Sequence, residues 1–207
     1  MERLTSAGAP PQRSADPPGA DPHVCPWQRG PLLMLSARKL VQNPRRILRP
    51  HVAAGMTALD VGCGMGYFTI PMAELVGDRG QVVAVDLQPQ MLAGLAETAR
   101  RAHRANITPQ QADRDSLNID RWSGAVDFAL LFMVLHEVPD PGRLVRQVRQ
   151  ALAPAGRLLF AEPIGHVGPA AFRRSRSMIE EVGFRAISSP RIAVCRAAVF
   201  GTRALDG

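Results

Sequence analysis

The sequence predicts an α/β fold in which a doubly wound, mostly parallel sheet carries helices on both faces. Two observations support this prediction. From residue 55 onward, short β-like runs alternate with helical stretches, which is the pattern of parallel strands joined by crossover helices. The stretch 125–134 (AVDFALLFMV) is almost continuously apolar, as expected of a central strand that is buried on both faces.

The first half of this pattern contains two strands and two helices. The stretch 56–62 (MTALDVG) is a buried strand that ends at a glycine cluster, and the helical stretch 67–77 stops at its terminal glycine. A second strand is expected over 81–87 (QVVAVDL). The helix expected over 88–105 has one apolar face and gathers arginines at its C-terminal end, where they suit the helix dipole.

The second half begins with a weak strand over 107–113, in which Pro109 and two glutamines indicate an edge position in the sheet. The elements expected after it are strand 125–134, amphipathic helix 140–152, strand 153–163, helix 168–184 and one or two final strands up to residue 201. Asp140 is placed to cap helix 140–152, with Pro141 at the first helical position.

The sequence ahead of this pattern divides into two parts. Residues 1–22 are rich in Pro, Gly, Ala and Ser and lack the apolar run of a secretory signal, which predicts a disordered tail. Residues 23–50 are expected to form a helical cap segment in front of the α/β domain at 51–207. That segment can pack on the core, cover the functional site, or present a basic amphipathic face to a membrane surface.

The chain has a formal net charge of +7 that comes almost entirely from arginine, since Lys39 is the only lysine. The arginines are spread through every segment, which favours a solvated surface but leaves a polyanion-binding face open, with the densest cluster at 43–50. Three scattered cysteines show no metal-ligand spacing, so we expect no metal and a reducing, cytoplasmic location. No apolar run is long enough to span a bilayer.

The most informative motif is LDVGCGMGYFT (59–69), a strand, a glycine-rich turn and the start of a helix. Such a turn lets the backbone approach a ligand closely. Gly62, Gly64 and Gly66 do not have the G-x-x-G ending of a dinucleotide site, because Tyr67 occupies the last position. Asp60 would repel phosphates, so it indicates a ligand that carries positive charge.

These residues resemble the first cofactor motif of the class I S-adenosylmethionine-dependent methyltransferases, and the resemblance covers about residues 50–200. It implies that Asp60 lies near the methionine ammonium group of the cofactor. It further implies that Asp86, at the end of the second strand, binds both ribose hydroxyls, although such an acid suits the ribose of NAD as well. Asp113 matches the acid that contacts the adenine amino group, with the alternative that it caps the next turn.

The resemblance implies a Rossmann-like sheet of seven strands, the last of them antiparallel, and makes 51–207 a class I methyltransferase domain. The chain also looks like a group of small, uncharacterised prokaryotic proteins of this superfamily, which implies no particular methyl acceptor. The expected cofactor-binding residues are Asp60, Gly62, Cys63, Gly64, Gly66, Asp86, Leu87, Ala112, Asp113, Arg114 and Phe132.

Several acceptor classes are disfavoured because their motifs are absent. The chain has LHEV after the fourth strand, where amine methylation of nucleic acids typically uses [DN]-P-P-[YF]. It lacks a suitably placed cysteine for cytosine C5 methylation and the clustered carboxylates of metal-dependent catechol methylation. The sequence therefore favours methyl transfer to a small molecule through proximity and in-line orientation, with a modest base or none.

The catalytic candidates are His136 and Glu137, at the carboxyl end of the fourth strand. Adjacent residues leaving a strand point opposite ways, so we expect only His136 to face the cofactor. The candidates on the acceptor side are Cys25, Trp27, Glu162 and His166, of which Cys25 and Trp27 can instead be packing residues. Two other functions stay open, an RNA methyltransferase and a protein that binds S-adenosylmethionine without catalysis.

Overall fold

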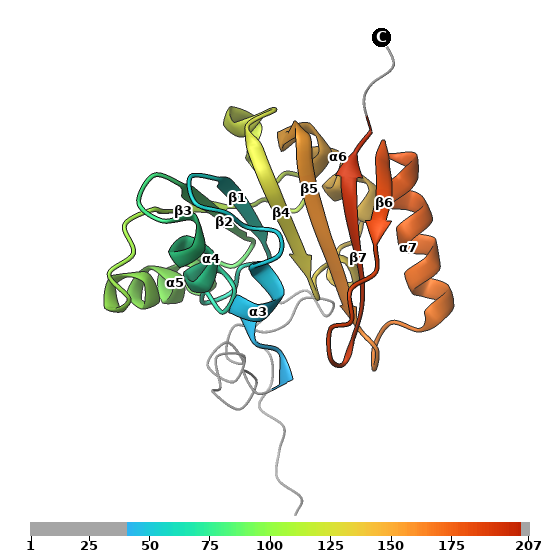
Figure 1. The fold of residues 1–207 in the computed structure, drawn as a ribbon, viewed down its shortest axis with the longest axis horizontal. Helices are drawn as coiled ribbons and strands as arrows, with labels where there is room; N and C mark the ends of the chain where they lie inside the picture. The colour runs from blue at the N-terminus through green and yellow to red at the C-terminus, as the bar shows by residue number, and fades with distance from the viewer. Residues whose placement is uncertain (1–40, 204–207) are drawn as a thin grey trace, which may run out of the picture.

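The expected alternation of strands and helices is present in the computed structural model, which describes residues 41–203 (Figure 1). The strands are β1 (Thr57–Val61), β2 (Gln81–Asp86), β3 (Ile107–Gln111), β4 (Val126–Phe132), β5 (Leu152–Pro163), β6 (Phe184–Ser188) and β7 (Cys195–Thr202). The helices are α3 (Pro44–Leu48), α4 (Thr69–Val76), α5 (Pro89–Arg101), α6 (Pro141–Ala151) and α7 (Pro169–Glu181), with 3₁₀ turns η2 (Asp120–Trp122) and η3 (Leu135–Glu137). The predicted tail 1–22 and residues 23–40 lie outside the described residues.

The strands form one seven-stranded sheet in the order β3-β2-β1-β4-β5-β7-β6. Strand β7 is antiparallel to both of its neighbours, whereas the pairs from β3 through β5 are parallel. The predicted fold class is therefore confirmed, including the antiparallel last strand. The prediction that the strand containing Pro109 lies at an edge is also confirmed, because β3 ends the sheet.

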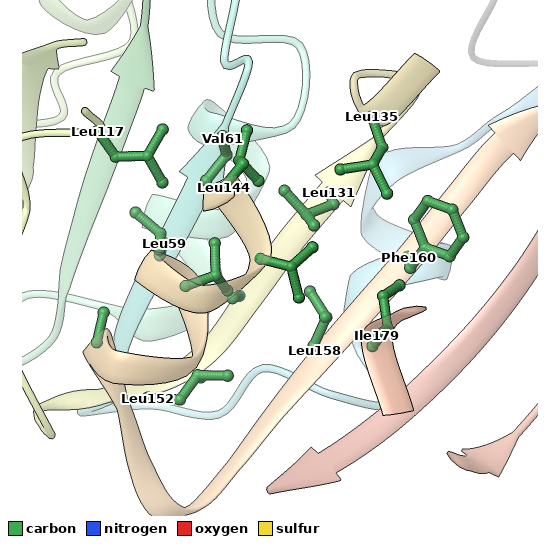
Figure 2. Packing of buried hydrophobic residues seen from close by; sticks show 14 of the residues in the cluster. Leu59, Val61, Leu117, Leu131, Leu135, Leu144, Leu152, Leu158, Phe160 and Ile179 are labelled. Atoms are coloured by element: carbon green, nitrogen blue, oxygen red, sulfur yellow. The ribbon is translucent and has the colours of Figure 1, made fainter. Parts of the chain in front are cut away.

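The helices cover both faces of the sheet (Figure 1). Leu48 of α3 and Met72 of α4 belong to a buried cluster on one face, and α6 and α7 pack on the other. Figure 2 shows this second cluster, in which Leu131 and Leu158 of the sheet lie near Leu144 of α6. Burial of each such side chain contributes about 1.5–3 kcal/mol, so these two clusters hold the strands that carry the site.

The alternation of side chains along β1 decides where its acidic residue points. Leu59 and Val61 belong to the cluster under α6, whereas Ala58 belongs to the cluster under α4. Asp60 has the same parity as Ala58 and contacts Thr69 of α4. The strand thus delivers the carboxyl group to the α4 side, at the carboxyl end of the sheet.

Some element boundaries differ from the sequence prediction. The helix predicted over 168–184 ends at Glu181, because Gly183 adopts a left-handed conformation with φ of 100° and a new strand, β6, begins at Phe184. The helix predicted from residue 67 begins at Thr69, since the glycine turn extends through Phe68. The remaining helices and strands lie within one to four residues of the predicted ends, as is usual for such boundaries.

The described part of the predicted cap segment packs on the domain core. Helix α3 starts at Pro44 behind an Asn43 cap, buries Leu48, and forms an ion pair between Arg45 and Glu74 of α4. Within residues 41–203, no helix combines the length and the apolar character needed to cross a membrane. The cytoplasmic location stays a prediction.

Candidate active site

A cavity of about 380 Å³ lies at the carboxyl ends of the parallel strands, beside the point where the strand order reverses between β1 and β4. Open α/β sheets bind their ligands in this crevice, and the volume lies within the range of small-ligand pockets. The walls come from the loops after β1 to β5 and from the start of α6. The cavity therefore lies at the edge of the sheet where such folds hold their ligands.

Most residues predicted from the sequence line this cavity: Asp60, Gly62, Cys63, Gly64, Asp86, Leu87, Ala112, Asp113, Arg114, Phe132, His136, Glu137 and His166. Two do not line it: Gly66 packs closely against Leu95, and Glu162 is buried in contact with His136. Cys25 and Trp27 lie outside the described residues. Within residues 41–203, no group of His, Cys, Asp and Glu side chains is arranged to hold a metal ion.

The three loop glycines all adopt left-handed conformations, with φ of 73° at Gly62, 53° at Gly64 and 99° at Gly66. A Cβ on Gly62 would lie 2.7 Å from Val134, and one on Gly66 would lie 2.7 Å from Leu95. These two glycines therefore allow the loop to pack closely on the neighbouring elements. Gly64 lines the cavity, and a Cβ there would meet no atom within 4 Å.

The carboxylate of Asp86 is held at the end of β2 by backbone groups. Its oxygens accept hydrogen bonds from the N–H groups of Gly64 and Gln88, each at 2.9 Å. Burial raises the pKa of Asp86, and these hydrogen bonds oppose the shift. Each oxygen keeps further acceptor capacity, so the oriented carboxylate can bind hydroxyl groups of a ligand.

Asp60 is an almost fully buried acid, with 3% of its surface exposed. Its Oδ2 accepts a hydrogen bond of 2.6 Å from the Thr69 hydroxyl. Burial raises the pKa of Asp60 to about 7, against the lowering effect of the Thr69 hydrogen bond, and the charge of Asp86 adds to the increase. Among residues 41–203, no ion pair neutralises either acid. A cationic ligand would therefore be stabilised here.

The third acid, Asp113, is exposed and fixed by a side chain five positions away. Its Oδ2 accepts a hydrogen bond from the Asn118 amide at 2.9 Å, and its own N–H donates to the Ser116 carbonyl at 2.7 Å. Asn118 also donates to the Gln111 carbonyl at 3.1 Å. The carboxylate thus belongs to a closed turn after β3, at the edge of the cavity.

The chain turns sharply after β4. Met133 has a left-handed φ of 59°, and residues 135–137 form the 3₁₀ turn η3. The argument that His136 and Glu137 point opposite ways assumed an extended chain, whereas in this turn both residues line the cavity. That only His136 faces the cofactor stays a prediction. The expected cap is confirmed, since Asp140 accepts a hydrogen bond of 2.8 Å from the Arg143 N–H.

His136 is paired with Glu162 rather than only with its neighbour Glu137. Its Nδ1 lies 2.5 Å from Oε2 of Glu162, whereas its Nε2 lies 3.9 Å from Oε1 of Glu137. The Glu162 hydrogen bond raises the pKa of His136, against the effect of burial, and the charges of both glutamates add to the increase. A histidine in this setting can accept a proton from a ligand in the cavity.

Sequence reasoning missed residues that hold the site residues in place. Thr69 binds Asp60, Asn118 binds Asp113, and Oε1 of Gln147 accepts the Leu117 N–H at 2.8 Å. The only signal for Thr69 was its place at the start of the helix after the glycine loop. Cys63 lines the cavity, and burial raises the pKa of its thiol, which disfavours the thiolate form that a nucleophile needs.

The buried acid Asp60, the glycine loop and the oriented carboxylate of Asp86 fit a ligand that carries positive charge and sugar hydroxyls. S-Adenosylmethionine has both features. The fold and the site thus define a class I S-adenosylmethionine-dependent methyltransferase, and the predicted cofactor is confirmed. The chain belongs to a family described as methyltransferase domain, whose model matches residues 53–188.

Similar proteins agree with this assignment. The chain is 32% identical over 111 residues to a demethylmenaquinone methyltransferase of Shouchella clausii, covering 54% of this chain and 46% of the relative. It is 32% identical over 115 residues to a protein-L-isoaspartate O-methyltransferase of Caenorhabditis elegans, covering 55% and 49%. The chain thus spans about half the length of these curated relatives.

Solved structures show the same fold. An S-adenosylmethionine-dependent methyltransferase from Aquifex aeolicus matches with a TM-score of 0.76 at 20% identity, over 86% of this chain and 98% of that one. The [4+2]-cyclase SpnF matches with a TM-score of 0.66 at 16% identity, over 78% and 80%. Because a cyclase shares this fold, the acceptor reaction has to be argued from the site.

Proposed function

We propose that this methyltransferase transfers a methyl group to a small-molecule acceptor bound in the same cavity, by in-line displacement. The observation that carries the proposal is the single cavity that contains both the cofactor-motif residues and His136. Holding two reactants in one such site provides most of the acceleration that an intrinsically reactive methyl donor needs.

We further propose how the residues divide the cavity. Asp86 binds the ribose hydroxyls, Asp60 stabilises the positively charged methionine end, and Asp113 contacts the adenine amino group between Ala112 and Arg114. When bound, S-adenosylmethionine supplies an electrophilic methyl group on a sulfonium. His136 and Glu137 line the remaining end, and His166 joins them from the loop after β5.

Apolar side chains near His136 support a small organic acceptor. Met133, Val138, Pro139 and Leu144 line the cavity together with His136. Six of the similar curated proteins are demethylmenaquinone methyltransferases. We therefore choose demethylmenaquinone, in its reduced form, as the first acceptor to test.

The experiment measures transfer of labelled methyl from S-adenosylmethionine by the full chain to reduced demethylmenaquinone, to a metabolite extract and to total RNA. The proposal predicts label in the quinone or in small metabolites. Label in RNA would contradict it and support the nucleic-acid alternative. Cofactor binding in a calorimeter without label in any fraction would support the non-catalytic alternative.

A further inference from the structure

Two carboxylates lie close to the His136 ring, those of Glu137 and Glu162. Resting on the function proposed above, we propose that Glu162 is a positioning residue that holds His136 as a general base for an acceptor with an acidic hydroxyl group, such as a phenol or an enol. His136 would be the catalytic residue, because it lines the cavity, whereas Glu162 acts through it.

Both carboxylate oxygens of Glu162 contact His136. Oε1 accepts the backbone N–H of His136 at 3.2 Å, and Oε2 lies 2.5 Å from Nδ1 of the same residue. Because an ionised carboxylate can only accept hydrogen bonds, the contact places the hydrogen of a neutral ring on Nδ1. The lone pair then resides on Nε2, which is the arrangement a general base requires.

The surroundings of Glu162 supply no other charged partner among the described residues. The carboxylate is 1% exposed at the end of β5. Arg196 stands opposite it on β7, but the Arg196 guanidinium donates to the Val167 carbonyl at 2.7 Å. An isolated buried carboxylate is strongly unfavourable, so the contact with His136 is the interaction that compensates its burial.

Three ionisable groups from separate elements face the His136 ring. Glu162 lies on β5, Glu137 lies on η3 with Oε1 3.9 Å from Nε2, and the His166 ring lies 5.8 Å away in the loop after β5. Both carboxylates favour the imidazolium form, which raises the pKa of His136. This brings the base closer to the pKa of a phenol, about 10, and so favours proton transfer.

The proposed methyl transfer accounts for every proton and electron pair. The acceptor hydroxyl gives its proton to Nε2 of His136, and the O–H electron pair stays on the acceptor. An oxygen, or a ring carbon conjugated to it, then forms a bond to the methyl carbon, while the methyl–sulfur bond breaks with its electron pair going to sulfur. When a ring carbon is methylated, that carbon afterwards loses its own hydrogen as a proton to water, and the C–H electron pair returns to the ring and restores the acceptor hydroxyl or its anion. The imidazolium, stabilised by Glu162, returns its proton to water after the product leaves.

The test is the tautomer and titration of His136, observed by NMR in the full chain with isotope-labelled histidine. The proposal predicts hydrogen on Nδ1 in the neutral wild-type ring and a titration midpoint above the usual 6.5. Glu162→Gln should move the midpoint to lower pH, because one amide oxygen cannot replace two charged acceptors. Glu162→Asp should recover part of the shift.

The control is Glu97→Gln, since Glu97 is an exposed acid of α5 that pairs only with Arg100 and Arg101 among the described residues. It should leave the His136 titration unchanged. Hydrogen on Nε2 in the wild-type protein, or an unchanged midpoint in Glu162→Gln, would overturn the proposal. The wild-type measurement needs no variant, so it stands even where Glu162→Gln does not fold.

Activity gives a second, separate readout. With reduced demethylmenaquinone as acceptor, Glu162→Gln should lower kcat on the order of 10-fold to 100-fold and move the acid limb of the pH profile to lower pH. A fall in kcat without movement of that limb would contradict the positioning role. Absence of transfer by the wild-type protein would count against the acceptor chosen under the proposed function, whereas the NMR result would still decide the role of Glu162.

Discussion

The two ends of the cavity are built in different ways. At the proposed cofactor end, Asp86 is held by backbone groups of the glycine loop and of Gln88, two residues further on. At the proposed acceptor end, Glu162 contacts His136 across 26 positions of the sequence. The cofactor end thus depends on the local conformation of short loops, and the acceptor end depends on a side-chain contact between the ends of β4 and β5.

This difference suggests that the two ends can be altered independently. A loop of left-handed glycines and capped carboxylates suits one ligand of fixed shape, whereas a side-chain pair can change with the acceptor. Substitutions at one end should therefore change cofactor affinity, and substitutions at the other should change turnover.

The largest effect is expected at the acceptor end. His136→Gln should lower kcat by about 10²-fold to 10⁴-fold, because it removes the base, while the affinity for S-adenosylmethionine measured by calorimetry stays unchanged. Glu137→Gln should lower kcat less, since Glu162 holds the ring. Equal losses of turnover and cofactor affinity in His136→Gln would show that the two ends are not separate.

The next effect is expected at the cofactor end. Asp86→Asn should weaken binding of S-adenosylmethionine by about 10-fold to 100-fold, because hydrogen bonds to a charged group contribute about 1.5–3 kcal/mol. The control is Asp127→Asn, whose carboxylate accepts the Thr57 N–H at 2.8 Å at the opposite end of β1. If calorimetry gave both variants the same affinity, the assigned role of Asp86 would be wrong.

A smaller effect concerns the glycine loop. Gly62→Ala should lower the free energy of unfolding by about 1–3 kcal/mol more than Gly55→Ala, as measured with urea. Both glycines have left-handed φ, but only at Gly62 would a Cβ meet a side chain, that of Val134 at 2.7 Å. Equal losses would mean that the approach of the loop to the chain after β4 is not tight.

The smallest effect is a pH dependence of cofactor binding. The pKa of Asp60 is raised to about 7, above about 3.9 in an unfolded chain. Its contribution to stability is therefore complete below about pH 4 and is lost as the pH rises through about 7. A cationic ligand favours the ionised acid, so S-adenosylmethionine should bind up to about 10-fold more tightly at pH 8 than at pH 6. An equally steep dependence in Asp60→Asn would assign it to another group.

The local geometry around the glycine loop could be predicted from the sequence better than the contacts of His136. Gly62, Gly64 and Asp86 lie in short motifs whose spacing is set by a strand, a turn and a helix, so their placement follows from local structure. The His136–Glu162 contact depends on the register between β4 and β5, which no local pattern encodes. The 3₁₀ turn that brings His136 and Glu137 to the same cavity was likewise not visible in the sequence.

The most direct test of the account is a crystal structure with S-adenosylhomocysteine. We expect the adenine beside Asp113, the ribose hydroxyls on Asp86 and the sulfur facing the end of the cavity that His136 lines. That arrangement would place the transferred methyl group between the donor and the proposed base. A ligand bound the other way round, with its adenine beside His136, would contradict the division of the cavity into a cofactor end and an acceptor end.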